Sequence, residues 1–272
     1  MINKRSRNGL NPFRLFLFPF VVSIYEIRYI DRGRNKCGEG EKLKTSEKFE
    51  TRKKVVFAIV LTLLIISVFY AIYMLFQAPS GVAQNEGERV KTDYVLMVLQ
   101  CLVGAIVIFL PKKVEDHFEV RIPNAIEITY FIFLFCAIYL GEVRNFYFRV
   151  PYWDVILHAF SAAMLGALGF ILVDYLTGIE NLNLRLSPFF VSFFAFCFSV
   201  TCGIIWEIYE FLADGILNTN MQKFITAHGE VMIGRAALVD TMKDIIVDVL
   251  GALVVVVFGY FTLKRKQKES AA

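Results

Sequence analysis

Long apolar segments constrain the fold of this chain more than any other feature of its sequence. An α-helix rises ~1.5 Å per residue, so about 20 apolar residues cross the ~30 Å hydrocarbon core of a bilayer. Each backbone polar group in that core needs a partner within the protein, and a helix supplies them all. The sequence therefore predicts an all-α fold, a polytopic membrane helix bundle of about six transmembrane helices. These lie near Val55–Gln77, Tyr94–Leu110, Asn124–Gly141, Val155–Leu176, Pro188–Ala213 and Thr241–Leu263.

The composition supports a single membrane domain at residues 55–263. Hydrophobic residues make up 57% of the chain and charged residues 20%, which is too apolar for an ordinary soluble domain. Polar residues gather in an N-terminal segment, residues 1–54, and in a short basic tail, residues 264–272. Within the N-terminal segment, Leu15–Tyr25 is mostly apolar but short for a span, which predicts an interfacial segment. We expect residues 31–54 to form a solvated linker.

The basic residues are concentrated before the first apolar segment. Of the 29 lysines and arginines, 14 lie in residues 1–54. Lysine and arginine accumulate on the cytoplasmic side of membranes, so this bias predicts that both termini are cytoplasmic in a multi-pass plasma-membrane protein. A basic segment can also bind nucleic acid, but beside a transmembrane segment it more often sets topology and contacts anionic lipids. We therefore expect membrane lipids as partners and no nucleic acid.

The cysteines and the small residues indicate packing rather than chemistry. The 5 cysteines offer neither a disulfide framework nor a zinc-binding Cys-x2-Cys spacing. Most of them lie in apolar segments, where thiols pack as small core residues. The spacing of Ala162 and Gly166 permits close approach of helices, and Gly251 can do the same. Ordinary helix packing without a specific close contact explains these small residues equally well.

The last three apolar segments carry ionisable residues at one end only and on one helical face. The patterns are Asp154-x3-His158, Glu207-x2-Glu210 and Asp240-x3-Asp244-x3-Asp248. Residues three or four apart share a helix face. An ionisable group inside an apolar span costs roughly 2.5–3.5 kcal/mol, so it usually persists where it pairs or functions. Because successive spans alternate in direction, the three patterns meet at the outer side, and the sequence predicts a shared polar site there.

Carboxylates that share one site repel one another unless protons, basic groups or a cation compensate. A divalent cation suits carboxylate oxygens, and one imidazole extends the choice from magnesium to manganese or zinc. The candidate metal ligands are Asp154, His158, Glu207, Glu210, Asp240 and Asp244. The candidate catalytic residues, which can exchange protons, are His158, Asp244 and Asp248. The candidate ligand-binding residues, which can clamp an anionic headgroup, are Arg144, Arg149 and Arg235.

Structural roles compete with these functions. Asp154 and Asp240 stand at helix starts, where an aspartate caps the helix or interacts with its dipole. The two glutamates can form salt bridges with the outer arginines, and a single buried histidine is more often a core residue than a ligand. Asp244 and Asp248 lie deeper in their segment, so a functional role explains them best.

The surroundings of these motifs carry three further expectations. Glu127 and Asp174 lie near inner ends of spans and are expected to be solvated. The mixed polarity of residues 214–239 is compatible with a loop that folds back over the outer mouth. Aromatic residues near the outer ends indicate an interfacial belt, namely Tyr147, Tyr152, Trp153 and Trp206.

The polar motifs, taken with their neighbours, also carry a family resemblance. They read Tyr152-Trp153-Asp154-x3-His158, Glu207 with Tyr209-Glu210-Phe211, and Asp240-Thr241-x2-Asp244 followed by Gly251-Ala252. In this order they resemble the YjdF-like family of bacterial multi-pass inner-membrane proteins, over residues 124–260. That resemblance implies a helical membrane protein without an established biochemical activity. It covers neither the basic N-terminal segment nor any role that this segment plays.

A looser similarity links the chain to VanZ-like membrane proteins, which are associated with glycopeptide-antibiotic resistance. The shared order is Asp-x3-His, an acidic helix motif, then Arg235 and Asp240-x3-Asp244 leading to Gly251. It suggests a cell-envelope or lipid-headgroup context and transfers no reaction.

The sequence leaves three classes of function open. In the first, a cation at the polar site makes the protein a metal-assisted enzyme for, or a binder of, a phosphate-bearing envelope lipid. In the second, the acids at Asp240, Asp244 and Asp248 form a relay for a cation or proton transporter or channel. In the third, the charges form a buried network that fixes helix register. No Ser-His-Asp triad, P-loop or dinucleotide fingerprint is found in the sequence.

Overall fold

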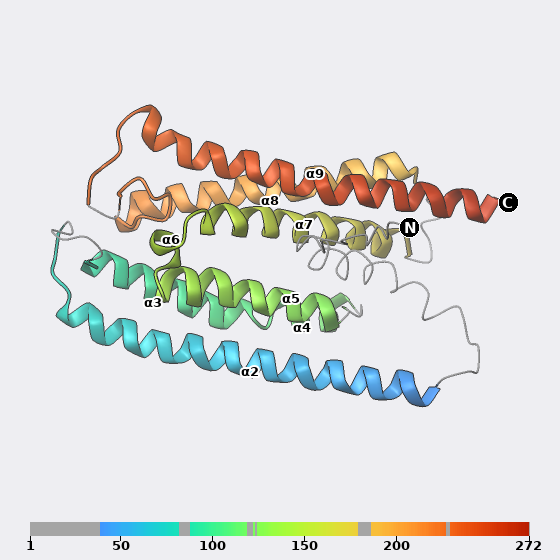
Figure 1. The fold of residues 1–272 in the computed structure, drawn as a ribbon, viewed down its shortest axis with the longest axis horizontal. Coiled ribbons are helices and arrows are strands. Elements are labelled where there is room, and N and C mark those ends of the chain that lie inside the picture. Colours follow the sequence, from blue (N-terminus) through green and yellow to red (C-terminus); the bar gives the residue numbers. More distant parts are fainter. Residues whose placement is uncertain are drawn as a thin grey trace, which may run out of the picture.

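A computed structural model describes residues 39–81, 88–118, 122, 124–178, 186–226 and 229–271. Nearly all of these residues are helical, and β-structure in the described part is limited to one isolated bridge between Ile225 and Val231. Figure 1 shows the helices running roughly side by side along the long axis of the molecule. The predicted all-α bundle is therefore confirmed.

The helices follow one another with short connections. In chain order they are α2 (Glu39–Gln77), α3 (Lys91–Val107), α4 (Leu110–Phe118), α5 (Asn124–Leu134), the π-helix η1 (Phe135–Val143), α6 (Phe146–Arg149), α7 (Trp153–Gly178), α8 (Pro188–Leu217) and α9 (Arg235–Ala271). Within the described residues, 6 helical stretches are long and apolar enough to cross a membrane. They are α2, α3 with α4, α5 with η1, α7, α8 and α9.

The first transmembrane helix begins earlier than the sequence analysis expects. Residues 39–54 form the first turns of α2 rather than a solvated linker. Lysine and glutamate are good helix formers, so the helix that the bilayer nucleates propagates beyond it into water. The interfacial segment predicted at Leu15–Tyr25 lies outside the described residues.

Two groups of helices pack side by side. Helices α2, α3 and α5 form one group, and α7, α8 and α9 form the other (Figure 1). Ile126 of α5 joins the groups by packing with Ala163 and Ala167 of α7 and Val255 of α9. Many large apolar side chains on the outer faces remain exposed, for example Phe76 at 81%. In a bilayer such faces contact lipid, so the bundle is built for a membrane.

Small residues hold the second group together at close range. A Cβ atom on Gly251 of α9 would lie 2.6 Å from the Ala159 carbonyl oxygen of α7, and one on Gly169 would lie 2.7 Å from Ala195 Cα of α8. The predicted packing role of Gly251 is therefore confirmed. Gly166 meets its neighbours only at ordinary contact distance, 3.8 Å or more, so of these two glycines of α7 it is Gly169 that allows the closer approach.

The connections that contain residues 143–153 and 218–234 lie at the same end of the bundle, together with the end of α2 and the start of α3 (Figure 1). We call this the loop end. Helix α2 begins, and α9 ends, at the opposite end (Figure 1). The loop end is the one that the basic-residue distribution predicts to face outward.

Candidate functional site

A group of ionisable side chains lies between α7, α8 and α9 toward the loop end. We call it the acid cluster and define it as Asp154 and His158 of α7, Glu207 of α8, and Asp244 and Asp248 of α9. Asp154 is half-buried, and the other four are buried. The four-residue spacings in α7 and α9 place each pair on one face, which explains why distant segments meet here.

His158 is the centre of the acid cluster. Its Nδ1 atom lies 3.3 Å from Asp248 Oδ1, while its Nε2 atom lies 3.8 Å from Glu207 Oε1 and 4.0 Å from Asp154 Oδ1. With the proton on Nδ1, the imidazole donates a hydrogen bond to Asp248 and turns the Nε2 lone pair toward the other carboxylates. A carboxylate that orients a histidine in this way is the usual support of a metal-binding imidazole.

Three residues of the cluster are close enough together to hold one ion. Asp154, His158 and Asp244 each offer a ligand atom, and these atoms lie within 4.8 Å of one another. Asp244 Oδ1 and Glu207 Oε1 are buried and have no hydrogen-bond partner in the described part of the chain. Buried carboxylate oxygens without partners are costly, and a cation or a proton would satisfy them. The donor set of one imidazole and carboxylates therefore fits a divalent metal.

The packing around Asp248 is tight. A Cβ atom on Gly203 of α8 would lie 2.4 Å from Asp248 Oδ2. Only glycine at this position leaves room for the carboxylate that positions His158. Ser199, one turn earlier on α8, donates to the carbonyl oxygen of Ala162 and so ties α8 to α7.

The loop after α8 reaches the acid cluster through Lys223. Its Nζ atom lies 2.6 Å from Asp154 Oδ2 and 4.5 Å from the centre of the Tyr147 ring. Burial lowers the pKa of Lys223, but the nearby Asp154 and Glu210 carboxylates outweigh this and raise the pKa above its ordinary value of 10.5. Lys223 is therefore a fixed positive charge at the mouth of the cluster. The sequence does not predict this contact, because one lysine in a loop carries no periodic signal.

Asp214, near the end of α8, anchors this loop. Its carboxylate accepts hydrogen bonds from Thr219 Oγ1 at 2.7 Å, Met221 N at 2.7 Å and Gln222 N at 2.9 Å. The Gln222 side chain then donates to Thr241 Oγ1 of α9 at 2.8 Å. These contacts, with that of Lys223, confirm that the loop folds back over the site.

Two of the predicted metal ligands, Glu210 and Asp240, lie outside the acid cluster, whereas Glu207 lies in the cluster but not in the group of three. Glu210 is buried but accepts a hydrogen bond from Trp206 Nε1 at 2.8 Å, within α8. Asp240 is half-buried in the first turns of α9, one turn before Asp244. Both stand at the same end as the cluster, and Lys223 interacts electrostatically with both.

The predicted ligand-binding arginines are exposed and do not contact the acid cluster. Arg235 begins α9. Arg144 and Arg149 line a cavity of about 280 Å³ beside α2 and α3, together with Arg89. The structure thus separates two of the arginines from the acids by placing them at a different cavity.

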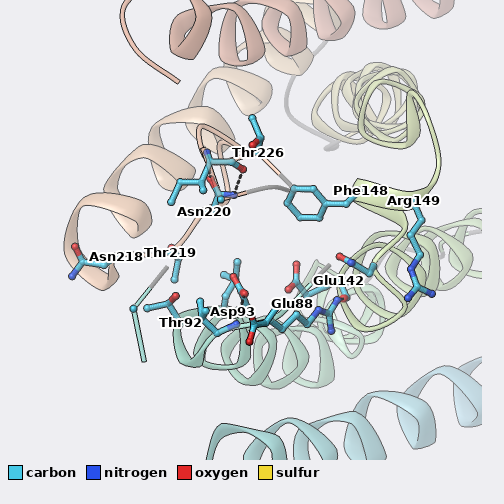
Figure 2. A pocket seen from close by; sticks show the side chains of 17 residues that line it. Glu88, Thr92, Asp93, Glu142, Phe148, Arg149, Asn218, Thr219, Asn220 and Thr226 are labelled. Atoms are coloured by element: carbon cyan, nitrogen blue, oxygen red, sulfur yellow. Dashed lines mark hydrogen bonds between the residues drawn. The ribbon is translucent and has the colours of Figure 1, made fainter. Parts of the chain in front are cut away.

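A larger cavity of about 460 Å³ also opens at the loop end (Figure 2). It is lined by the start of α3, the η1–α6 turn and the loop after α8. In Figure 2, Thr92 and Asp93 lie on one side of it, and Asn220 and Thr226 lie opposite. No residue of the acid cluster lines this cavity, so the larger of the two cavities is not the place where the cluster lies.

At the other end of the bundle, one expectation is wrong. Glu127 is only 4% exposed and forms an ion pair with Lys53 at 2.6 Å instead of being solvated. The reason is the extension of α2, which carries Lys53 alongside α5. Asp174 is exposed, as expected.

The fold and the cluster define a class of protein: a multi-pass helical membrane protein with a buried His/Asp/Glu site. This fits the predicted location in a bacterial plasma membrane. The chain belongs to the family described as "Predicted membrane protein (DUF2238)", which matches residues 54–265. That match overlaps all six transmembrane helical stretches and contains the entire acid cluster.

A curated relative is a Thermotoga maritima protein that bears only the description "Uncharacterized protein". It is 30% identical over 147 residues, which cover 53% of this chain and 66% of the relative. The chain therefore aligns with just under two thirds of the relative's length. No solved structure matches the chain.

Proposed function

We propose that the acid cluster binds a divalent cation through Asp154, His158 and Asp244. We propose further that this cation acts on the phosphate of an envelope lipid, in a metal-assisted enzyme or a lipid-binding protein. One observation carries the proposal. The buried oxygens Asp244 Oδ1 and Glu207 Oε1 have no hydrogen-bond partner in the described chain, beside a histidine whose second nitrogen is held by Asp248.

The donor atoms favour zinc or manganese over magnesium. Magnesium prefers oxygen ligands and keeps much of its water, whereas an imidazole nitrogen with carboxylates suits zinc and manganese. His158 supplies the imidazole, and Asp248 fixes its orientation through Nδ1.

A bound cation would neutralise a phosphate oxygen and lower the pKa of a bound water. The chain supplies the other groups that such chemistry needs. Glu207 lies 3.8 Å from His158 Nε2 and has an unpartnered oxygen, so it is placed to accept a proton. Lys223, released from Asp154 when a cation binds there, is placed to pair with an anionic headgroup.

The position of the cluster favours a lipid. It lies near the end of the bundle that topology predicts to face outward, between helices whose other faces meet hydrocarbon. The VanZ-like similarity agrees with an envelope or headgroup context. The YjdF-like resemblance stays a prediction and adds no reaction.

Metal analysis tests the proposal directly. The purified protein is stripped with chelator, reloaded with zinc or manganese and measured by elemental analysis beside Asp244→Asn. We expect one tightly held ion in the original protein and loss of about 100-fold or more in affinity in the variant. Asp116→Asn, an exposed aspartate of α4, is the matched control. Equal metal content in the original protein and Asp244→Asn, or no metal in either, would refute the cation site.

The transport alternative receives less support from the interior of the bundle. Beyond Asp248, the buried residues of α9 are Ala252, Val255, Val256 and Gly259, which have no polar side chain. On α8, the buried polar side chains on that side of the cluster are the uncharged hydroxyls of Ser192 and Ser199. Proton or cation flux into liposomes, abolished by Asp248→Asn, would revive this alternative. A purely structural network would instead show reduced abundance when charges are removed, with normal metal content in the protein that remains.

A further inference from the structure

We infer that Arg89, Arg144 and Arg149 form a second ligand site, which binds a phosphate group at the loop end and is independent of the acid cluster. The cavity of about 280 Å³ that they line lies between the end of α2, the start of α3 and the η1–α6 turn. Its remaining lining consists of Tyr70, Tyr94, Val143 and Asn145.

The charges of this cavity are unbalanced. Three guanidinium groups line it, and no carboxylate does. Arg89 has acidic neighbours in Asp93 and Glu142, which line the adjacent larger cavity. Arg144 and Arg149 form no ion pair in the described part of the chain. Positive groups held together in this way favour an anion, and guanidinium matches phosphate oxygens with paired hydrogen bonds.

The backbone organises the site before any ligand arrives. Arg89 donates to the carbonyl oxygens of Glu142 and Val143, at the end of η1, so its side chain is fixed against the π-helix. Asn145 has φ 62°, which turns the chain sharply between η1 and α6. This turn brings Arg144 and Arg149, five residues apart, to one cavity.

The donors present suit a phosphate. The Tyr70 and Tyr94 hydroxyls hydrogen-bond to each other, which leaves one phenolic O–H and the Asn145 amide as neutral donors beside the guanidinium groups. At about 30 Å³ of liquid volume per water, the cavity has room for a phosphate with several waters. Figure 2 shows Arg149 at the edge of the larger cavity, beyond Phe148 and on the side opposite Asn218 and Thr219.

The cavity lies at the depth in the membrane where lipid headgroups are expected. Tyr70 lies seven residues before the end of α2 at Gln77, which is roughly 10 Å along the helix. Tyrosine and arginine near the ends of transmembrane helices occupy the interface, where lipid phosphates also lie. The shared chemistry is a phosphate group, carried by a lipid or free in solution.

Calorimetric titration in a maltoside detergent tests the site with two probes, dihexanoyl phosphatidylglycerol and inorganic phosphate. We expect Arg144→Gln with Arg149→Gln to weaken binding about tenfold or more, because charge-assisted hydrogen bonds are lost. Lys112→Gln with Lys113→Gln, an exposed pair on α4, removes the same charge and should leave binding unchanged. Arg144 and Arg149 are exposed, so the variant should fold, and its melting temperature checks this.

The probes separate the sources of the phosphate. Arginine-dependent binding of phosphatidylglycerol alone identifies a lipid site, and arginine-dependent binding of inorganic phosphate identifies a site for the free ion. Absence of binding for both probes, equal weakening in the lysine pair, or unchanged affinity in the arginine pair would overturn the inference. Asp244→Asn should keep this binding, which distinguishes it from the proposed cation site.

Discussion

The ion pair between Lys223 and Asp154 makes a specific prediction about the proposed cation site. The ammonium lies 2.6 Å from Asp154 Oδ2, and the two side chains are only 18% and 15% exposed. A cation that uses Asp154 therefore competes with a charged partner for the same carboxylate. We expect Lys223→Ala to tighten binding of zinc or manganese, because it frees the carboxylate and removes a positive charge from the mouth of the cluster.

The magnitude follows from the geometry of this pair. A hydrogen bond to a charged group contributes about 1.5–3 kcal/mol, so its removal should lower the Kd of the cation roughly 10- to 100-fold. The same change leaves Asp154 without its partner and should lower the melting temperature of the metal-free protein. Added cation should then raise the melting temperature more in Lys223→Ala than in the original protein.

Calorimetry on metal-free protein in detergent measures the Kd, and thermal melts with and without cation measure the stabilisation. Because the pKa of Lys223 is raised above 10.5, the ion pair is intact throughout the neutral range and is lost only as pH rises beyond that value. Lys243→Ala, an exposed lysine on α9, is the control. Unchanged or weaker cation binding in Lys223→Ala would refute the competition.

Three further changes probe the supports of the site. Asp248→Asn should weaken cation binding about 10- to 100-fold while leaving one ion bound at saturation, because the Asp248 carboxylate orients His158 and does not hold the ion. Complete loss of the ion would contradict this role. Gly203→Ala should weaken binding similarly, since the new Cβ would lie 2.4 Å from Asp248 Oδ2, whereas Gly215→Ala meets nothing within 4 Å and serves as its control in the same titration. Glu127→Ala should destabilise the fold by roughly 2–4 kcal/mol in denaturant or thermal unfolding, with unchanged cation affinity; a lowered affinity would show that the two ends are coupled.

The bundle could be predicted from the sequence because the membrane imposes a simple rule on each span. Apolar length alone located six helices, and each one found in the structure overlaps its predicted segment. The meeting of His158, Asp244 and Glu207 was also predictable. Helix periodicity places residues four apart on one face, and alternating spans bring the three segments to the same end.

The features that the sequence did not predict depend on contacts between elements. Lys223 reaches Asp154 because Asp214 anchors the loop, and no local pattern records that contact. The π-helix η1 has an ordinary apolar sequence and no proline, so its altered hydrogen bonding leaves no compositional sign. The separation of Arg144 from the acids follows from one left-handed residue, Asn145, which redirects the chain.

The pairing of Glu127 with Lys53 was missed for a different reason. The boundary of α2 was placed at the start of the hydrocarbon core, whereas the helix begins 16 residues earlier, at Glu39 rather than Val55. Helix ends in water depend on propensity and capping, which constrain them far less than the bilayer constrains the middle of a span.

The lysine on the loop after α8 also bears on how such a protein is made. A site built only from carboxylates would have to acquire its metal, or protons, before its helices could associate in lipid. Here the Lys223 ammonium, on the loop after α8, neutralises part of that negative charge. Membrane insertion and helix assembly therefore do not depend on prior delivery of a metal. Loading of the proposed cation would then be an ion exchange in the finished bundle, in which the divalent ion would take the place of the ammonium at Asp154.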